Sequence, residues 1–270
     1  MPEGPEVETV RRTLKHFVLH KTIESVDVRY SKIIEDDPDL FIQKVSGQHI
    51  CDIRRRGKYL IFLLDDVAFL SHLRMEGKYN IKSQDTLYEK HDHVIFHLED
   101  GTDLRYNDTR KFGRMKLIDP IHYNEMPPLN KLGPDPSEAT FEEVYPKIHK
   151  SHLPIKTLLL DQSIMAGIGN IYANEICFAL GLDPRTRASR LSKKRVKELI
   201  VTADQILEEA IKQGGTTIHS FDANGITGLF QVKLKVHAQE TCSVCHSPIK
   251  KIQLNGRGTY FCPVCQKRRY

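Results

Sequence analysis

The stretch CSVCHSPIKKIQLNGRGTYFCPVC, residues 242–265, decides the fold of the C-terminal part of this chain. It spaces four cysteines as C-x2-C-x16-C-x2-C, within the range of structural zinc sites. Each pair can present two thiolates to one tetrahedral ion, and Zn²⁺ closes such a site with four sulfurs. Two disulfides are the alternative, less expected because residues 1–20 show no export signal. The spacing predicts a small β-hairpin holding one structural Zn²⁺ on Cys242, Cys245, Cys262 and Cys265.

The same segment is strongly basic. Residues 241–270 contain six Lys or Arg and no Asp or Glu, so with a net charge of +5 the rest of the chain sums to about −1. A basic patch on a near-neutral body indicates a polyanionic partner, most simply nucleic acid. Arg257 lies in the Asn-Gly-Arg-Gly sequence at the expected hairpin tip, where a guanidinium can grip a phosphate. A merely solvated tip is the alternative.

Composition describes an ordinary globular protein. The 270 residues suffice for two or three domains, with 40% hydrophobic and 28% charged residues. No apolar run approaches the ~18–20 residues of a membrane span. We expect a cytoplasmic monomer that has no membrane partner and no organic cofactor.

The N-terminus, Met-Pro-Glu-Gly-Pro-Glu, offers a nucleophile. If Met1 is removed, Pro2 carries a free secondary amine, and α-amino groups titrate near ~8 against ~10.4 for Lys. Such an amine can attack an aldehyde carbon of a sugar and form an iminium. Glu3, beside it, can shuttle protons. A frayed terminus is the alternative, but apolar residues at helical spacing over 5–18 predict a helix that anchors the segment.

The remaining pattern is α+β with three expected domains. Short β-rich runs between residues 23 and 119, with a hairpin signal at Asp100-Gly101, predict a sandwich or barrel over 1–130. Residues 127–138 read as a linker. Helical patterns follow within 131–230, including one over 192–212, and strands return in 231–270. The glycine-rich segment 214–228 has the length of a functional loop.

Several residues have a functional and a structural interpretation. Cys51 and Cys177 are expected to be small buried hydrophobes. The amides of the helix beginning near Asn170 form an anion site or simply pack a turn. Met75 and Phe112 at strand ends could be wedges between base steps or core residues.

Together, ten stretches closely resemble the bacterial formamidopyrimidine-DNA glycosylase family along nearly the whole chain. They are PEGPEVETV, RRRGKYL, HLRMEGKY, EKHDHV, DTRKFG, LGPDP, LLLDQ, AGIGNIYANE, GGTT and GRGTYFCPVCQ. The resemblance implies a base-excision repair enzyme with an N-terminal β-sandwich with flanking helices, a helix-two-turn-helix domain and a zinc hairpin. Its partner would be damaged double-stranded DNA, from which it removes oxidised purines.

The resemblance also implies residue roles. Pro2 looks like the nucleophile that attacks the sugar C1′, and Glu3 like the acid/base that assists ring opening. Lys58 and Arg257 resemble residues that contact DNA beside the lesion and assist strand cleavage by β,δ-elimination. The implied DNA contacts fall into three groups: gap-filling side chains (Met75, Arg110, Phe112), phosphate contacts (His91, Lys156, Asn170) and a loop over the extruded base (214–230).

Some positions depart from the family pattern. Gly4 stands where the purine-lesion branch usually has Leu, and it matches the related endonuclease VIII branch, which prefers oxidised pyrimidines. His246 and His237 also replace usual residues in and near the zinc segment. HLRMEGK, EKHDHV and DTRKFG still favour the purine branch. A pyrimidine-lesion glycosylase and a catalytically silent zinc-containing DNA-binding protein remain the alternatives.

Overall fold

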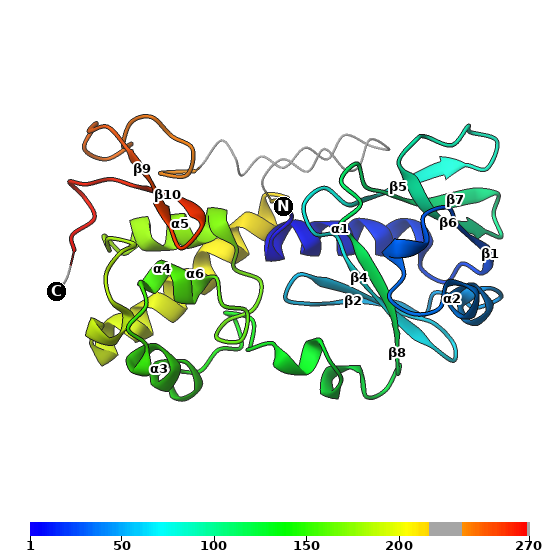
Figure 1. Cartoon of the computed structure of the whole chain (residues 1–270), viewed down its shortest axis with the longest axis horizontal. Coiled ribbons are helices and arrows are strands. Elements are labelled where there is room, and N and C mark those ends of the chain that lie inside the picture. The colour runs from blue at the N-terminus through cyan, green and yellow to red at the C-terminus, as the bar shows by residue number, and fades with distance from the viewer. Residues whose placement is uncertain (216–233, 269–270) are drawn as a thin grey trace. The chain divides into compact units, whose positions relative to one another are not determined.

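The computed structural model describes residues 1–215 and 234–268. The chain divides into two compact units (Figure 1). The first contains Met1–Pro2 and Glu6–Asn130. The second contains Glu3–Pro5 and the described residues from Lys131 onward.

The first unit is a β-sandwich preceded by helix α1 (Gly4–Val18). One antiparallel sheet has the strand order β1-β6-β7-β5 and the other β2-β3-β4-β8. The strands are β1 (Ile23–Val28), β2 (Asp52–Arg56), β3 (Tyr59–Leu63), β4 (Ala68–His72), β5 (Lys78–Ser83), β6 (Asp92–Leu98), β7 (Thr102–Asn107) and β8 (Arg114–Ile118).

Aromatic rings from both sheets form the core of this unit. Phe69 of β4 stacks on Phe96 of β6 with ring centroids 5.5 Å apart, and helix α2 (Pro38–Val45) adds Phe41, whose centroid lies 5.4 Å from that of Phe69. Helix α1 buries Val7, Val10, Leu14 and Val18 at helical spacing. The predicted hairpin at Asp100-Gly101 joins β6 to β7, with Gly101 at φ +78°.

The second unit combines helices with the C-terminal hairpin. Its helices are α3 (Phe141–Lys150), α4 (Ile155–Leu159), α5 (Asn170–Ala179) and α6 (Lys193–Lys212). The predicted helix over 192–212 is confirmed as α6. Ser192 caps its first turn by accepting from the Arg195 amide.

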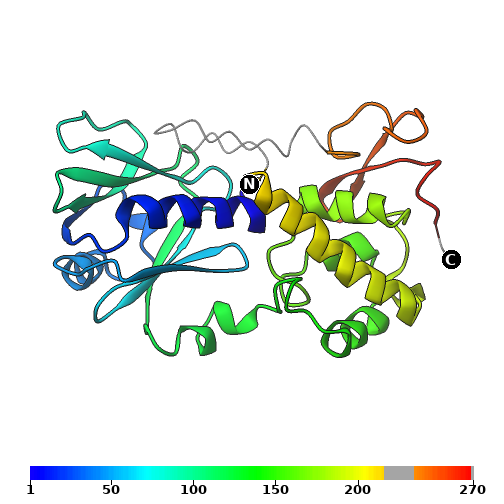
Figure 2. The same cartoon turned by 180° about the vertical axis from the view of Figure 1, so that it is seen from behind.

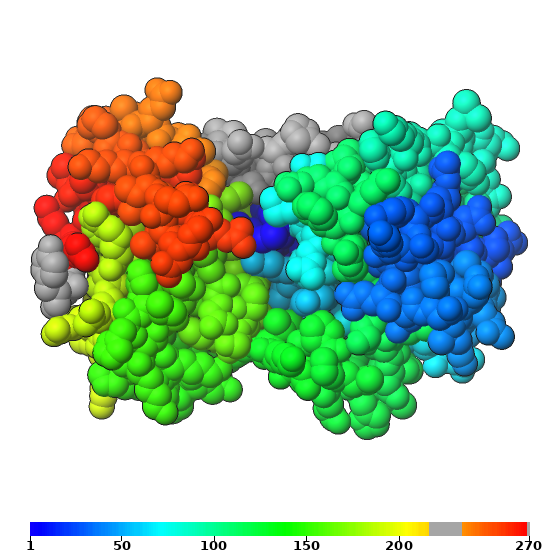
Figure 3. Space-filling model, viewed as in Figure 1, coloured from blue at the N-terminus to red at the C-terminus, as the bar shows by residue number. Residues whose placement is uncertain are grey.

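The hairpin consists of two short strands. Strands β9 (Lys250–Leu254) and β10 (Arg257–Phe261) pair antiparallel. Figure 2 shows this part of the chain from behind, in orange to red. Both strands contribute exposed side chains to the surface, where the hairpin is drawn in orange to red (Figure 3).

Three local features differ from the sequence-based expectation. Strand β5 and helix α2 are not among the expected elements. The sequence of β5, Lys78–Ser83, shows only weak alternation, so its strand identity depends on pairing with β7. Cys51 is exposed, not buried: its thiol lies 3.5 Å from Asp65 Oδ1, which gives the thiol a hydrogen-bond acceptor at the surface. Cys177 is fully buried, as expected. Among the helices in the described ranges, none is long and apolar enough to cross a membrane.

Candidate active site

Glu3 is held at the start of helix α5. Its side chain is buried, and its two carboxylate oxygens accept from the backbone N–H groups of Ile171 (2.9 Å) and Tyr172 (3.3 Å). Gly169 leaves the space for this side chain, since a Cβ there would lie 2.2 Å from the Glu3 carboxyl carbon. The sequence-predicted amide site near Asn170 therefore binds a carboxylate of the protein itself.

The next residue is anchored to the same turn. Gly4 donates its N–H to the Gly167 carbonyl at 2.8 Å, and a Cβ on Gly4 would lie 3.1 Å from both the Cα and the oxygen of Gly167. The side chain of Met1 is 43% exposed, whereas Pro2 is half-buried. Pro2 thus directly precedes two residues of fixed position, which opposes fraying of the terminus.

Lys58 occupies the tight turn between β2 and β3. It is buried and follows Gly57, which adopts φ +55°. Burial, together with the positive charges of Arg74 and Lys58, lowers the pKa of His72 to about 3. His72 is therefore neutral at physiological pH. Its Nδ1 accepts from the Arg74 amide at 2.9 Å, so the ring carries its proton on Nε2.

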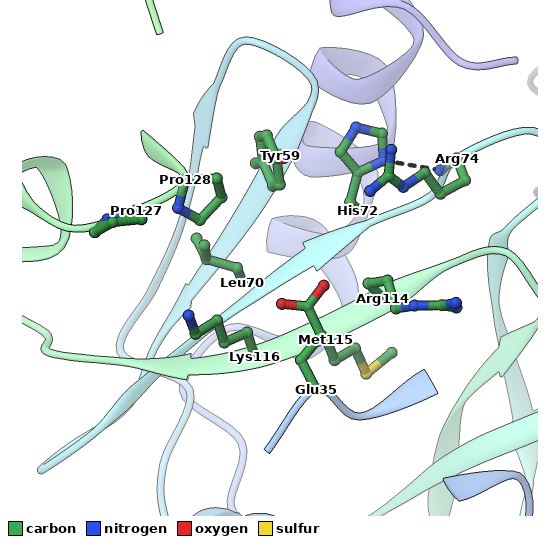
Figure 4. A pocket seen from close by; sticks show the side chains of 10 residues that line it. All are labelled: Glu35, Tyr59, Leu70, His72, Arg74, Arg114, Met115, Lys116, Pro127 and Pro128. Atoms are coloured by element: carbon green, nitrogen blue, oxygen red, sulfur yellow. Dashed lines mark hydrogen bonds between the residues drawn. The ribbon is translucent and has the colours of Figure 1, made fainter. Parts of the chain in front are cut away.

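A pocket of about 220 Å³ opens on the outer face of the β2-β3-β4-β8 sheet (Figure 4). Tyr59 packs edge-on against His72, with centroids 4.6 Å apart. The lining contains three cations and one carboxylate, so it favours an anionic ligand. The lining residues are Glu35, Tyr59, Leu70, His72, Arg74, Arg114, Met115, Lys116, Pro127 and Pro128. They come from separate stretches, and no local motif indicates them.

Asp108 organises the loop that presents Arg110 and Phe112. This fully buried carboxylate accepts from the backbone N–H groups of Arg110 (3.0 Å), Phe112 (2.9 Å) and Gly113 (2.8 Å). The Arg110 guanidinium lies 4.8 Å from the centroid of the Phe112 ring, which is 47% exposed. Phe112 is therefore outside the core. Asp108 was not singled out from the sequence, although an Asp two residues before a bend is a familiar turn signal.

A second loop carries Met75, and like the Arg110 and Phe112 loop it packs against Tyr106. A Cβ on Gly77 would lie 2.2 Å from the Tyr106 hydroxyl, and one on Gly113 would lie 1.6 Å from it. Tyr106 thus fills the space that both glycines leave open. Thr109 also hydrogen-bonds the Glu76 carboxylate across the two loops. These contacts bring the half-buried Met75 loop beside the Arg110 and Phe112 loop.

His91 borders this loop pair. Its carbonyl accepts from the Asp108 N–H at 3.1 Å, and its ring centroid lies 6.0 Å from that of His93. The Nδ1 atom of His91 is buried and makes no hydrogen bond with any described residue.

Lys156 is the centre of a polar cluster in the second unit. Its buried ammonium donates to Asn170 Oδ1 (2.8 Å), the Gly258 carbonyl (3.0 Å) and Thr259 Oγ1 (2.7 Å). Burial is the main reason that the pKa of Lys156 falls to about 8. The negative charge of Glu3 raises this pKa, and the positive charge of Arg257 lowers it. A phosphate contact was expected for Lys156. In this structure its ammonium holds Asn170 and strand β10 together through these three hydrogen bonds, and the phosphate contact stays a prediction.

Arg257 begins strand β10, directly after the Asn255-Gly256 turn. Both turn residues adopt positive φ, +47° and +75°, as a two-residue hairpin requires. Asn255 anchors the turn by donating to Thr157 Oγ1 at 3.0 Å. The exposed side chain of Arg257 is thereby displayed on an ordered hairpin.

Glu175 is a further residue that sequence reasoning missed. It is buried and accepts from the backbone N–H groups of Lys235 (2.8 Å), Val236 (3.1 Å) and His237 (2.8 Å). It fixes the chain where the described residues resume. Most of the glycine-rich loop expected over 214–230 lies outside the described residues.

The four predicted zinc ligands converge on one point. The sulfur atoms of Cys242, Cys245, Cys262 and Cys265 lie within 4.8 Å of one another, with separations of 3.8 Å for Cys242 to Cys265 and 3.4 Å for Cys245 to Cys262. A tetrahedral ion with Zn–S bonds of ~2.3 Å requires sulfurs about 3.8 Å apart. The donor set therefore fits Zn²⁺, and four thiolates leave no open coordination position, so this zinc is structural.

Family models match three consecutive parts of the chain. Residues 1–115 match the formamidopyrimidine-DNA glycosylase N-terminal domain, residues 132–222 the H2TH domain of the same glycosylase, and residues 239–268 a zinc finger found in FPG and IleRS.

Full-length relatives and solved structures are also similar. Formamidopyrimidine-DNA glycosylase of Oceanobacillus iheyensis is 47% identical, with 100% of this chain and 99% of that protein covered. The Bacillus subtilis protein of the same name is 45% identical over the full length of both. The Lactococcus lactis Fpg bound to DNA with an abasic site aligns with a TM-score of 0.93 at 38% identity, covering 98% of this chain and 100% of that one. The wild-type L. lactis Fpg bound to DNA containing N7-benzyl-Fapy-dG gives 0.94 at 39% identity, covering 99% and 100%.

Proposed function

Because this chain belongs to the formamidopyrimidine-DNA glycosylase family, we propose that it removes oxidised purines from double-stranded DNA and then nicks the abasic strand. The substrates would be 8-oxoguanine and formamidopyrimidines. The observation that carries the proposal is Glu3, whose carboxylate is fixed on the first amides of α5 directly beside Pro2.

The proposed reaction uses the terminal amine as nucleophile. After removal of Met1, the Pro2 nitrogen attacks C1′ of the damaged nucleotide, and the C1′–N bond to the base breaks. The sugar ring opens as its oxygen takes a proton, leaving an iminium between Pro2 and C1′. Glu3 supplies and withdraws protons during these steps. Elimination at the two flanking phosphates, assisted by Lys58 and Arg257, then cleaves the strand, and water releases the enzyme.

Extrusion of the damaged nucleotide costs a few kcal/mol, which inserted side chains offset in part. The proposed wedge is Met75 with Arg110 and Phe112, since Phe112 is exposed and both loops are rigidly supported. Backbone phosphates would contact His91, Lys156 and Asn170, and also the cationic pocket beside Lys58. The enzyme would act as a cytoplasmic monomer, and the structural zinc would hold the hairpin that presents Arg257.

A trapping experiment tests the nucleophile. Borohydride reduces an iminium to a permanent adduct, and peptide mapping should place that adduct on Pro2. Pro2→Gly should retain part of the trapping because glycine still offers a terminal amine, whereas a protein that keeps Met1 should not be trapped. Glu3→Gln should lose base excision more severely than cleavage of a pre-formed abasic site. An adduct on Lys58, or undiminished trapping with Met1 in place, would contradict the mechanism, and a protein that is never trapped would be a silent DNA-binding protein.

Gly4 favours a second candidate, a glycosylase for oxidised pyrimidines. Glycine at this position matches that branch of the family. A side chain would be crowded here, because a Cβ on Gly4 would lie 3.1 Å from Gly167. Comparing initial excision rates on 8-oxoguanine opposite cytosine and on thymine glycol separates the candidates. Faster removal of 8-oxoguanine supports the purine assignment, and faster removal of thymine glycol overturns it.

A further inference from the structure

One buried carboxylate in the first unit collects three guanidinium groups. Glu8 of α1 is 8% exposed, and it accepts from Arg11 (2.7 and 2.9 Å), Arg12 (2.8 Å) and Arg55 of β2 (3.3 Å). Burial alone would raise the pKa of Glu8, but the hydrogen bonds from Arg11 and Arg12 and the charges of Arg11 and Arg55 lower it to about 2. Glu8 is therefore a carboxylate throughout the physiological range.

Arg55 extends this cluster to the turn that carries Lys58. While its Nε lies on Glu8, its Nη1 donates to the Gly57 carbonyl at 2.8 Å. The Gly57 carbonyl and the Lys58 nitrogen and Cα belong to one planar peptide unit. A hydrogen bond that fixes the direction of this carbonyl therefore also fixes the orientation of the peptide plane that contains the Lys58 nitrogen and Cα. Gly57 adopts φ +55°, and glycine by itself has little preference between positive and negative φ, so contacts such as this hydrogen bond define the turn.

Other contacts also tie α1 to β2, but they end elsewhere on the strand. Arg11 Nη1 donates to the Ile53 carbonyl at 3.3 Å, and Lys15 pairs with Asp52 at 2.6 Å. Asp52 is the first residue of β2, whereas Arg55 lies two residues before Gly57 of the turn. The Asp52 contact therefore provides an internal comparison, since it joins the same two elements without touching the turn.

We propose that Glu8 and Arg55 are positioning residues for Lys58. Glu8 orients the Arg55 guanidinium, Arg55 holds the Gly57 peptide, and the peptide aims the Lys58 side chain at its DNA phosphate. The proposal rests on the proposed role of Lys58 in strand cleavage. A planar fork that bridges two acceptors is required, so Lys cannot replace Arg55 even though it preserves the charge.

A double-mutant cycle tests this chain of contacts. The measured quantity is the single-turnover rate of strand cleavage at a pre-formed abasic site for the wild type, Arg55→Lys, Lys58→Ala and the double variant. Arg55→Lys should slow cleavage roughly ten- to a hundredfold, the usual penalty for a small misplacement of a working group. If Arg55 acts through Lys58, the double variant should be no slower than Lys58→Ala alone. Glu8→Gln should behave like Arg55→Lys, with the same coupling to Lys58.

Asp52→Asn is the matched control. It weakens the other link between α1 and β2, so it should lower the thermal midpoint while leaving the cleavage rate within about twofold of wild type. Multiplicative losses in the double variant would overturn the positioning role and leave the function of Lys58 intact. A wild-type rate for Lys58→Ala would instead remove Lys58 from the proposed mechanism, and the positioning role would fall with it.

Discussion

Asp108 illustrates at the residue scale how one buried side chain can define a loop. Its carboxylate accepts from the backbone N–H groups of Arg110, Phe112 and Gly113, and all three lose this acceptor when the carboxylate is removed. Unsatisfied buried donors cost about 1–3 kcal/mol each, so Asp108→Ala should lower the free energy of unfolding by about 2–4 kcal/mol.

The same substitution should affect activity selectively. Because the loop presents the proposed wedge, excision of a damaged base from duplex DNA should fall further than cleavage of a pre-formed abasic site. Asp100→Ala is a suitable control, since Asp100 makes similar local contacts to Thr102 in an exposed hairpin turn. Equal losses on both substrates would assign Asp108 a purely structural role.

At the scale of elements, the β9–β10 hairpin is stabilised from two sides. The thiolate cluster closes one end, and Lys156 with Asn170 holds Gly258 and Thr259 of β10. Since a four-thiolate zinc contributes directly to folding, Cys242→Ser should release the ion and loosen the hairpin. Affinity for damaged duplex should fall at least tenfold, and the slope of log affinity against log salt should flatten as phosphate contacts are lost.

The first unit should remain folded in that variant, because its core is separate and contains no part of the hairpin. Cys51→Ser, which alters an exposed thiol outside the cluster, should change neither zinc content nor affinity. One equivalent of zinc in Cys242→Ser, with unchanged affinity, would argue against the ligand assignment.

At the scale of the whole molecule, stability should decrease in mild acid. Burial lowers the pKa of His72 to about 3 and of His237 to about 4, both well below the ordinary 6.5. Between these values and pH 6.5 the unfolded chain binds protons that the folded chain does not, so stability is full above pH 6.5 and is lost as the pH falls. The low pKa of Glu8 adds a further loss below pH 4.5.

Thermal unfolding between pH 7.5 and pH 5 measures this effect. The midpoint should fall in the wild type and fall less in a His72→Gln, His237→Gln double variant. His16→Gln offers a control on the exposed side of α1. An equally steep pH dependence in the double variant would show that other groups govern acid stability.

Features determined by short-range chemistry could be predicted from the sequence. Paired cysteines two residues apart already form half a metal site, Val7, Val10 and Leu14 at helical spacing define one face of α1, and Asp100-Gly101 specifies a turn without distant help. The motif resemblance extended this to the three-part fold and the zinc.

Only the tertiary structure decided which distant groups share a contact. Glu3 meets an amide 168 residues further along the chain, Lys156 meets a carbonyl 102 residues away, and Arg55 meets Glu8 across 47 residues. The exposure of Cys51 and the strand identity of β5 likewise depend on neighbouring strands. A buried polar group must find its partner wherever packing delivers one, and local sequence does not encode that position.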